Sequence, residues 1–112
     1  MKLGRIVGTV VASQKDPKLE GMRLMLVEDI SLELQAKPSF VVAVDSVGAG
    51  EGEIVLYASG SSARMTEMTQ NRPIDATIMA IVDTLALEHK VIYDKHRDES
   101  ASREPSDATD AA

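Results

Sequence analysis

The sequence predicts an all-β protein, a small five-stranded barrel with one short helix. Three observations favour it: five short apolar segments rich in β-branched residues, turn residues between these segments, and glycines that interrupt the first of them. The five segments span residues 3–12, 22–30, 40–44, 54–57 and 74–85. Short strands at regular spacing are typical of a barrel. Gly4 and Gly8 in the first segment suit the bends that a small barrel requires.

The first two predicted strands are separated by a polar loop. Residues 13–21 are polar and contain the pair Asp16 and Pro17, which is a turn signal. In residues 22–30 the apolar side chains alternate in part, which predicts a strand with one face better buried than the other. Residues 31–39 are again polar and predict a connection to the third strand.

The third and fourth strands form the pair around which the sheet is organised. The segment between them holds three glycines and two acids: Gly48, Gly50, Gly52, Glu51 and Glu53. Glycine adopts backbone angles that other residues resist, so this segment is predicted to be a loop. An isolated pair of short strands is not stable in water, and therefore the pair must belong to a larger sheet.

A short helix is predicted to begin in residues 60–65 (GSSARM), where Ser61 or Ser62 would cap its first turn. It ends before Pro73, after two or three turns at most. Residues 74–85 alternate with a period of two and predict the fifth strand, although their Ala and Met content leaves a helix as an alternative.

The chain is expected to divide into three parts. Residues 1–84 form the barrel domain, and residues 85–97 form a C-terminal segment for which a helix is favoured. Residues 98–112 hold five acidic residues and one arginine, a net charge of −4 out of the −6 of the whole chain. They contain no large apolar side chain, so an acidic, disordered tail is predicted.

Composition excludes or disfavours several classes of function. The chain has no Cys, which excludes disulfides and thiolate metal sites. It is acidic, has 3% aromatic residues and no Trp, whereas a barrel that binds single-stranded nucleic acid needs a basic groove and stacking aromatics. No signal peptide and no span of ~20 apolar residues is found. We therefore expect a soluble, cytoplasmic protein without membrane or nucleic-acid partners.

Two glycine-containing motifs resemble catalytic or phosphate-binding loops only superficially. Residues 48–52 (GAGEG) lack the Lys-Ser/Thr of a P-loop and lie between strands, and Glu51 would repel phosphate. Residues 60–64 (GSSAR) lack the second glycine of a nucleophile elbow. Neither motif predicts a catalytic or cofactor site.

The titratable residues predict no metal or catalytic centre. His89 and His96 are seven residues apart, which on a helix separates them by about 10 Å, too far to share a metal directly. Asp45, Asp75 and Asp83 adjoin apolar runs near strand ends, where an acid normally meets water or caps a turn. A small enzyme that uses carboxylates such as Asp45 and Asp83 is an alternative that no other motif supports.

Several segments, taken together and in order, resemble the EutN/CcmL family of bacterial microcompartment shell vertex proteins. They are KLGRIVGTVVA at residues 2–12, Lys15 followed by LEG at 19–21, AVDSVGAG at 43–50, GSSAR at 60–64, PIDA at 73–76 and IVDT at 81–84. The combination of AVDSVGAG with GSSAR at this spacing is specific, although each piece alone is weak.

The resemblance implies an OB-like barrel that assembles as a cyclic homopentamer. Such pentamers cap the vertices of a carboxysome or metabolosome shell, beside hexameric shell proteins, and have no enzyme activity, cofactor or metal. The site residues that it suggests lie at a subunit interface or around an axial opening: Gly48, Ala49, Gly50, Gly60, Ser61, Ser62 and Arg64. An ordinary strand connection is the alternative for the glycines, and an exposed surface position is the alternative for Arg64. A small barrel that binds a nucleic acid or a small ligand is the second function considered.

Overall fold

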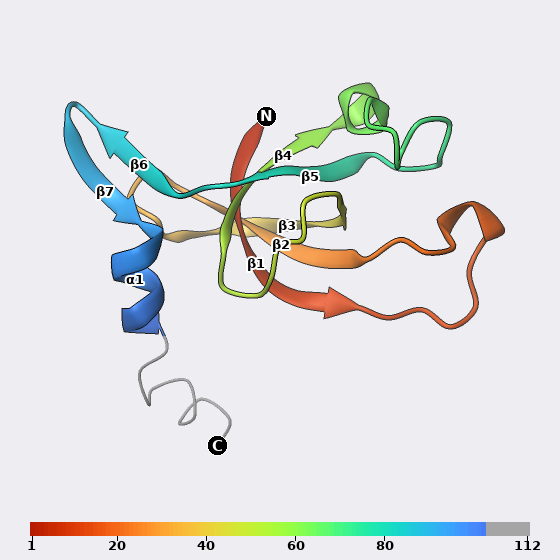
Figure 1. The fold of residues 1–112 in the computed structure, drawn as a ribbon, viewed down its shortest axis with the longest axis horizontal. Coiled ribbons are helices and arrows are strands. Elements are labelled where there is room, and N and C mark those ends of the chain that lie inside the picture. The colour runs from red at the N-terminus through yellow and green to blue at the C-terminus, as the bar shows by residue number, and fades with distance from the viewer. Residues whose placement is uncertain (103–112) are drawn as a thin grey trace, which may run out of the picture. The chain divides into compact units, whose positions relative to one another are not determined.

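Five strands close into a barrel in the order β1-β2-β3-β5-β4 (Figure 1). The computed structural model describes the backbone of residues 1–102 and the side chains of residues 1–98. The barrel strands are β1 (Lys2–Val10), β2 (Leu24–Ile30), β3 (Ala36–Asp45), β4 (Ile54–Ser59) and β5 (Ala76–Ile81). Neighbouring strands are antiparallel except β3 and β5, which are parallel. The predicted mostly-β, closed five-stranded barrel is confirmed.

The first strand bends where its glycines predict. The register of β1 against β2 shifts between Ile6 and Gly8, which marks a bulge in the strand. The third strand is longer than predicted, because β3 begins at Ala36 and not at residue 40. Pro38 lies in its exposed first half, opposite an irregularity in β2, where the missing N–H of proline is tolerated.

The helix predicted after residue 60 is only a 3-10 helix, η2 (Gly60–Arg64), followed by turns. Side chains satisfy the backbone here in place of helical bonds. Thr69 Oγ1 donates to the carbonyl of Ala63 at 2.7 Å, and the amide of Thr69 donates to Thr66 Oγ1 at 3.1 Å. Threonine hydroxyls that bond nearby backbone groups compete with helix formation. A second 3-10 helix, η1 (Pro17–Leu19), lies within the predicted loop of residues 13–21.

The described residues from 82 onward form a second compact unit, besides the unit of residues 1–81. It contains a hairpin of β6 (Thr84–Leu87) and β7 (Lys90–Asp94), followed by α1 (Lys95–Ser102). The helix favoured over residues 85–97 is therefore wrong up to Asp94. Glu88 and His89 have φ of 51° and 67°, and two successive residues at positive φ make the tight turn that joins hairpin strands.

The predicted disordered tail overlaps α1 at residues 98–102, and the rest of it, residues 103–112, lies outside the described residues. In the described part of the chain, no helix is long and apolar enough to cross a membrane.

Aliphatic side chains and one tyrosine fill the barrel interior. The buried cluster consists of Ile6, Met25, Val27, Ala43, Ala49, Val55, Tyr57, Ala76 and Ile78. A second cluster, formed by Val44, Ala63 and Ile74 with Leu19, Met22 and Leu24, packs together apart from the first. Val44 follows the inward-facing Ala43 along β3, so alternation places this second cluster on the outer side of the barrel wall.

Candidate functional site

The predicted site residues lie in two loops of the barrel unit. The β3–β4 loop (residues 46–53) carries Gly48, Ala49 and Gly50. The η2 loop (residues 60–75) carries the other four predicted residues. The structure thus groups the seven residues in two sets, each held by its own hydrogen bonds.

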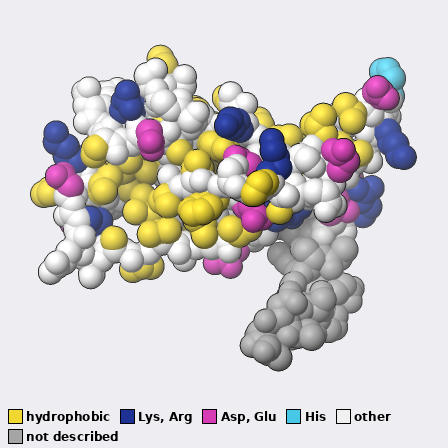
Figure 2. Space-filling view, turned by 180° about the vertical axis from the view of Figure 1, so that it is seen from behind, with side chains coloured by type: hydrophobic (Ala, Val, Ile, Leu, Met, Phe, Trp, Pro, Cys, Tyr) yellow, Lys and Arg dark blue, Asp and Glu magenta, His cyan; other side chains and the backbone are white. Residues whose placement is uncertain are grey.

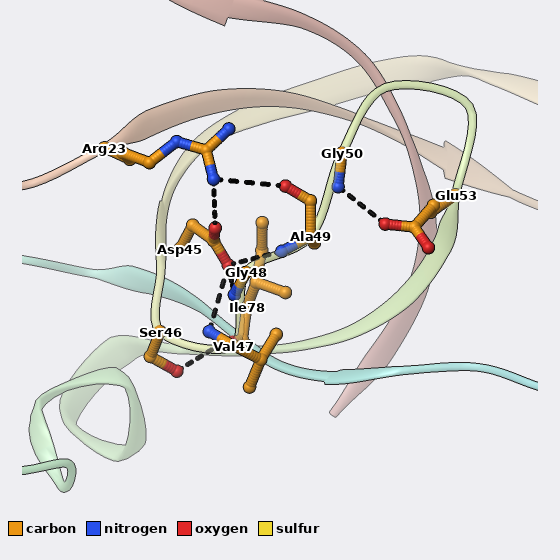
Figure 3. Close-up of polar contacts among 9 residues, drawn as sticks. All are labelled: Arg23, Asp45, Ser46, Val47, Gly48, Ala49, Gly50, Glu53 and Ile78. Atoms are coloured by element: carbon orange, nitrogen blue, oxygen red, sulfur yellow. Dashed lines mark hydrogen bonds and ion pairs between the residues drawn. The ribbon is translucent and has the colours of Figure 1, made fainter.

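Asp45 organises the first half of the β3–β4 loop (Figure 3). Its Oδ1 accepts hydrogen bonds from the amides of Val47, Gly48 and Ala49 at 3.0, 3.1 and 3.2 Å. Its Oδ2 accepts from Nη1 of Arg23 at 2.9 Å. The residue is only 5% exposed, so the carboxylate is nearly removed from water and its charge is balanced by these donors. The loop is therefore fixed in one conformation at its start.

The second half of the β3–β4 loop is bonded back to the barrel. The amide of Gly50 donates to Oε1 of Glu53 at 2.6 Å (Figure 3). The amide of Gly52 donates to the carbonyl of Ile6 at 2.8 Å, which extends the pairing of the loop with β1. Gly48 and Gly52 have φ of 78° and 87°, a conformation that strains any side-chain-bearing residue.

The three predicted residues of this loop differ in how far they are exposed. Gly48 is exposed, and a Cβ built on it would meet nothing within 4 Å, so its backbone borders open space. Gly50 is half-buried. The Ala49 methyl group belongs to the barrel core, so this side chain is turned away from the surface. Val47 is 40% exposed and adds an apolar side chain to the outer side of the loop.

The η2 loop has an anchored interior and an exposed outer side. The amide of Gly60, whose φ is 66°, donates to the carbonyl of Asp75 at 2.9 Å. Ala63 is buried, and its carbonyl accepts from Thr77 Oγ1 at 2.6 Å. Ser61 and Ser62 are exposed, and so is Arg64, although its Nη1 donates to the carbonyl of Ile74 at 3.0 Å. The predicted residues of this loop thus lie on the surface of the described barrel unit.

A second polar cluster joins β2, β3 and β4. Asp29 accepts hydrogen bonds from the hydroxyl of Tyr57 and, at 2.5 Å, from Oγ of Ser39. Burial and the hydrogen bond to Asp29 raise the pKa of Tyr57 to about 12. Burial acts to raise the pKa of Asp29 as well. Its two hydrogen bonds and the charges of Lys2 and Lys37 outweigh that effect and lower it.

Sequence reasoning gave Asp45 a place at a strand end, where an acid meets water or caps a turn, but it found neither polar cluster as a whole. An Asp followed by Ser and, two residues later, Gly is a signal for a side chain that bonds the backbone ahead of it, so the role of Asp45 was accessible. No local signal connects Asp45 to Arg23, or Asp29 to Tyr57, because the partners are 22 and 28 residues apart. Among the described residues, no group of three or more His, Asp or Glu side chains could hold a metal ion.

Comparison with known proteins identifies the family. The family described as ethanolamine utilisation protein EutN/carboxysome matches residues 1–83. The chain belongs to this family. It is 41% identical over 95 residues to the carboxysome shell vertex protein CcmL of Gloeobacter violaceus, covering 85% of this chain and 95% of that protein. It is 50% identical over 90 residues to the bacterial microcompartment shell vertex protein PduN of Salmonella typhimurium, covering 77% of this chain and 99% of PduN.

Solved structures of EutN/CcmL proteins have the same fold. The structure of Gloeobacter violaceus CcmL matches with a TM-score of 0.83 and covers 86% of this chain and 99% of that chain. The GrpN pentameric microcompartment shell protein from Rhodospirillum rubrum matches with a TM-score of 0.69 at 42% identity, covering 78% and 98% of the two chains.

Membership of the EutN/CcmL family confirms the resemblance that the sequence motifs indicate. The chain is a structural vertex protein of a bacterial microcompartment or carboxysome shell, and it is not an enzyme. The alternatives of a nucleic-acid-binding barrel and of a small enzyme built on Asp45 and Asp83 are set aside by this assignment.

Proposed function

We propose that the chain forms a homopentameric ring that occupies shell vertices, with hexameric shell proteins as its neighbours. The observation that carries this proposal is the likeness to relatives described as pentameric. GrpN of Rhodospirillum rubrum is one of them. The pentameric shell protein MSM0273 of the RMM microcompartment is another, 28% identical with a TM-score of 0.64.

The proposed role is geometric. Six-fold tiles cover a flat sheet, and a five-fold tile at a corner allows the sheet to close. A ring of identical chains uses a head-to-tail interface, so each chain must present two different surfaces that fit each other. The closed barrel supplies a stiff body for such surfaces, because its strands are hydrogen-bonded around the full circle.

The two loops are proposed to lie at the subunit contact or near the axis of the ring. Support for the β3–β4 loop comes from its fixed conformation and from the open space beside Gly48, which permits close approach of a neighbouring backbone. The contribution of Ala49 would be through its backbone, because its methyl group packs in the core. Support for the η2 loop comes from the exposure of Ser61, Ser62 and Arg64.

Native mass spectrometry at low salt tests the ring. We expect a dominant species of five times the 12.0 kDa mass of the chain. Mixing this species with hexameric shell proteins of the same organism should then give closed shells in electron micrographs, whereas the hexamers alone should give sheets, tubes or unclosed particles. A chain that stays monomeric or dimeric both alone and with the hexamers would contradict the proposal.

A further inference from the structure

Part of the outer face of β2 and β3 is apolar, from the pair Leu24↔Val44 to Phe40. A strand with one face in the core and one in water usually alternates apolar and polar residues. Here the inward-facing Met25 and Ala43, which pair across the two strands, are buried in the core. Their outward-facing neighbours are again apolar, and they form the pairs Leu24↔Val44 and Leu26↔Val42.

The chain covers only part of this outer face with its own loops. Leu24 and Val44 pack with Ala63 and Ile74 in the second cluster, and Val44 is 1% exposed. Farther along the strands, Val42 is 43% exposed and Phe40 is 65% exposed. Leu26, paired with Val42, is half-buried. We call Leu26, Phe40 and Val42 the β2–β3 strip.

The β2–β3 strip continues into a groove. A hollow of about 170 Å³ adjoins Val42 and is lined by Leu19, Leu24, Val42, Val44, Pro73, Ile74, Asp75 and Ala76. Figure 2, which shows the side turned away in Figure 1, has hydrophobic side chains gathered in one broad area. The strip and the groove together form an exposed apolar area with a recess at one end, and exposed apolar areas of this kind mark interaction sites.

The position of Phe40 is the strongest sign that this area is covered in the working protein. The chain has one Phe, two Tyr and no Trp. Its single Phe stands on the outside, opposite Glu28 of β2, while the core is filled by aliphatics and Tyr57. Aromatic side chains, Phe included, are enriched in protein–protein interfaces.

We propose that the β2–β3 strip is a subunit contact surface of the ring and that a second copy of this chain covers it. The inference rests on the proposed pentamer, since relatives described as pentameric point to another copy as the occupant. In a head-to-tail ring the strip contacts a different surface of the neighbouring subunit, so each chain uses two different surfaces. The acidic balance of the chain and Glu28 beside Phe40 oppose an anionic lipid or nucleic acid as the occupant.

A tryptophan reporter tests the strip without breaking it. The chain has no Trp, so Phe40→Trp introduces a single Trp of similar character at the end of the strip away from the groove. Leu32→Trp is the matched control, because Leu32 is 49% exposed and lies in the loop between β2 and β3, outside the strip. Iodide quenching is measured on rings isolated at the mass of the pentamer. We expect the quenching constant of F40W to be several-fold lower than that of L32W.

A charged variant gives an independent test of the inference. Phe40→Glu should convert the ring to monomers in native mass spectrometry and keep the far-UV circular dichroism of the barrel, while Leu32→Glu keeps the ring. Loss of the ring in F40W, with the ring kept in L32W, also counts for the inference.

The results separate the inference from the proposed function. A wild-type pentamer in which F40W is quenched as strongly as L32W, and which survives F40E, would overturn the inference and leave the pentamer standing. A wild-type chain that forms no ring would overturn the proposed function, and the inference with it.

Discussion

Nη1 of Arg23 lies 2.9 Å from Oδ2 of Asp45, and the amide of Asp45 lies 3.0 Å from the carbonyl of Arg23. These two contacts tie the residue before β2 to the residue that ends β3. The pair is asymmetric, because the Arg23 side chain is 57% exposed and the Asp45 side chain 2%. Arg23 can turn to water if its partner is lost, whereas the Asp45 carboxylate is buried and accepts hydrogen bonds from three loop amides.

Asp45→Ala should therefore destabilise the barrel much more than Arg23→Ala. Removing the carboxylate leaves the amides of the β3–β4 loop without their acceptor, at a cost of roughly 3 kcal/mol or more. Removing the largely exposed Arg23 guanidinium should cost about 1 kcal/mol or less. Asp45→Asn, which retains an acceptor oxygen, should fall between them. Urea unfolding at neutral pH measures all three, and equal losses for D45A and R23A would show that the loop amides contribute little.

The bond between Tyr57 and Asp29 predicts a stability change at high pH. The pKa of Tyr57 is raised from 10.0 to about 12 in the folded chain, so the neutral phenol stabilises the fold. This contribution is fully present below pH 10 and is lost as the pH rises from 10 toward 12. Tyr57→Phe should cost about 2 kcal/mol at neutral pH, the value of a hydrogen bond to a charged acceptor. The difference in unfolding free energy between wild type and Y57F should become smaller above pH 10.

Ser39→Ala is the control for the Tyr57 prediction. It removes the other hydrogen bond to Asp29 without removing a group that titrates at high pH. Urea unfolding is measured at pH 8, 10 and 11. Between pH 8 and pH 11, S39A should lose as much stability as the wild type, and Y57F should lose less. Parallel curves for wild type and Y57F would indicate that Tyr57 titrates normally in the folded state.

Gly4 and Gly8, both in β1, should respond differently to the same substitution. A Cβ on Gly4 would lie 2.4 Å from Cγ1 of Val27 and 3.1 Å from the carbonyl oxygen of Glu28, so the backbone or the core must shift. A Cβ on Gly8 would approach no atom closer than 3.8 Å. Gly4→Ala should cost roughly 1–3 kcal/mol by overpacking, and Gly8→Ala should be close to neutral. Thermal and urea unfolding of the pair compare them directly, and a neutral G4A would mean that β1 can move away from β2.

Local patterns in the sequence were sufficient for the barrel strands. Alternation and β-branched runs predicted the strands around Met25, Ala43 and Ile78, because burial of one face imposes a period of two. The same reasoning failed for residues 85–94. The hairpin there depends on positive φ at Glu88 and His89, and Glu and His are not typical turn residues. It also failed after Gly60, where Thr66 and Thr69 replace helical bonds by side-chain bonds.

The candidate site was less accessible than the fold. The family motifs indicated the residues around Gly48 and Gly60, but not the side-chain contacts that hold these loops. Asp45 reaches back 22 residues to Arg23, and such pairs depend on the closed sheet and on no local signal. The exposure of Phe40 was likewise hidden, since a Phe at the start of an apolar run looks the same whether it faces the core or the outside.

Arg64→Glu separates a role in the ring from a role in the barrel. Within one chain Arg64 is exposed and its guanidinium donates a single bond to the carbonyl of Ile74, so its loss should cost the barrel about 1 kcal/mol. Reversal of a charge that a neighbouring subunit has buried would cost several kcal/mol and release monomers.

Arg72→Glu is the matched control, because Nη1 of Arg72 likewise donates to a backbone carbonyl, that of Lys18, at 2.8 Å. If Arg64 lies in the interface, native mass spectrometry should find monomers for R64E and pentamers for R72E, and the R64E monomer should keep the far-UV circular dichroism of the barrel. Intact pentamers for R64E would place Arg64 on the open surface of the ring.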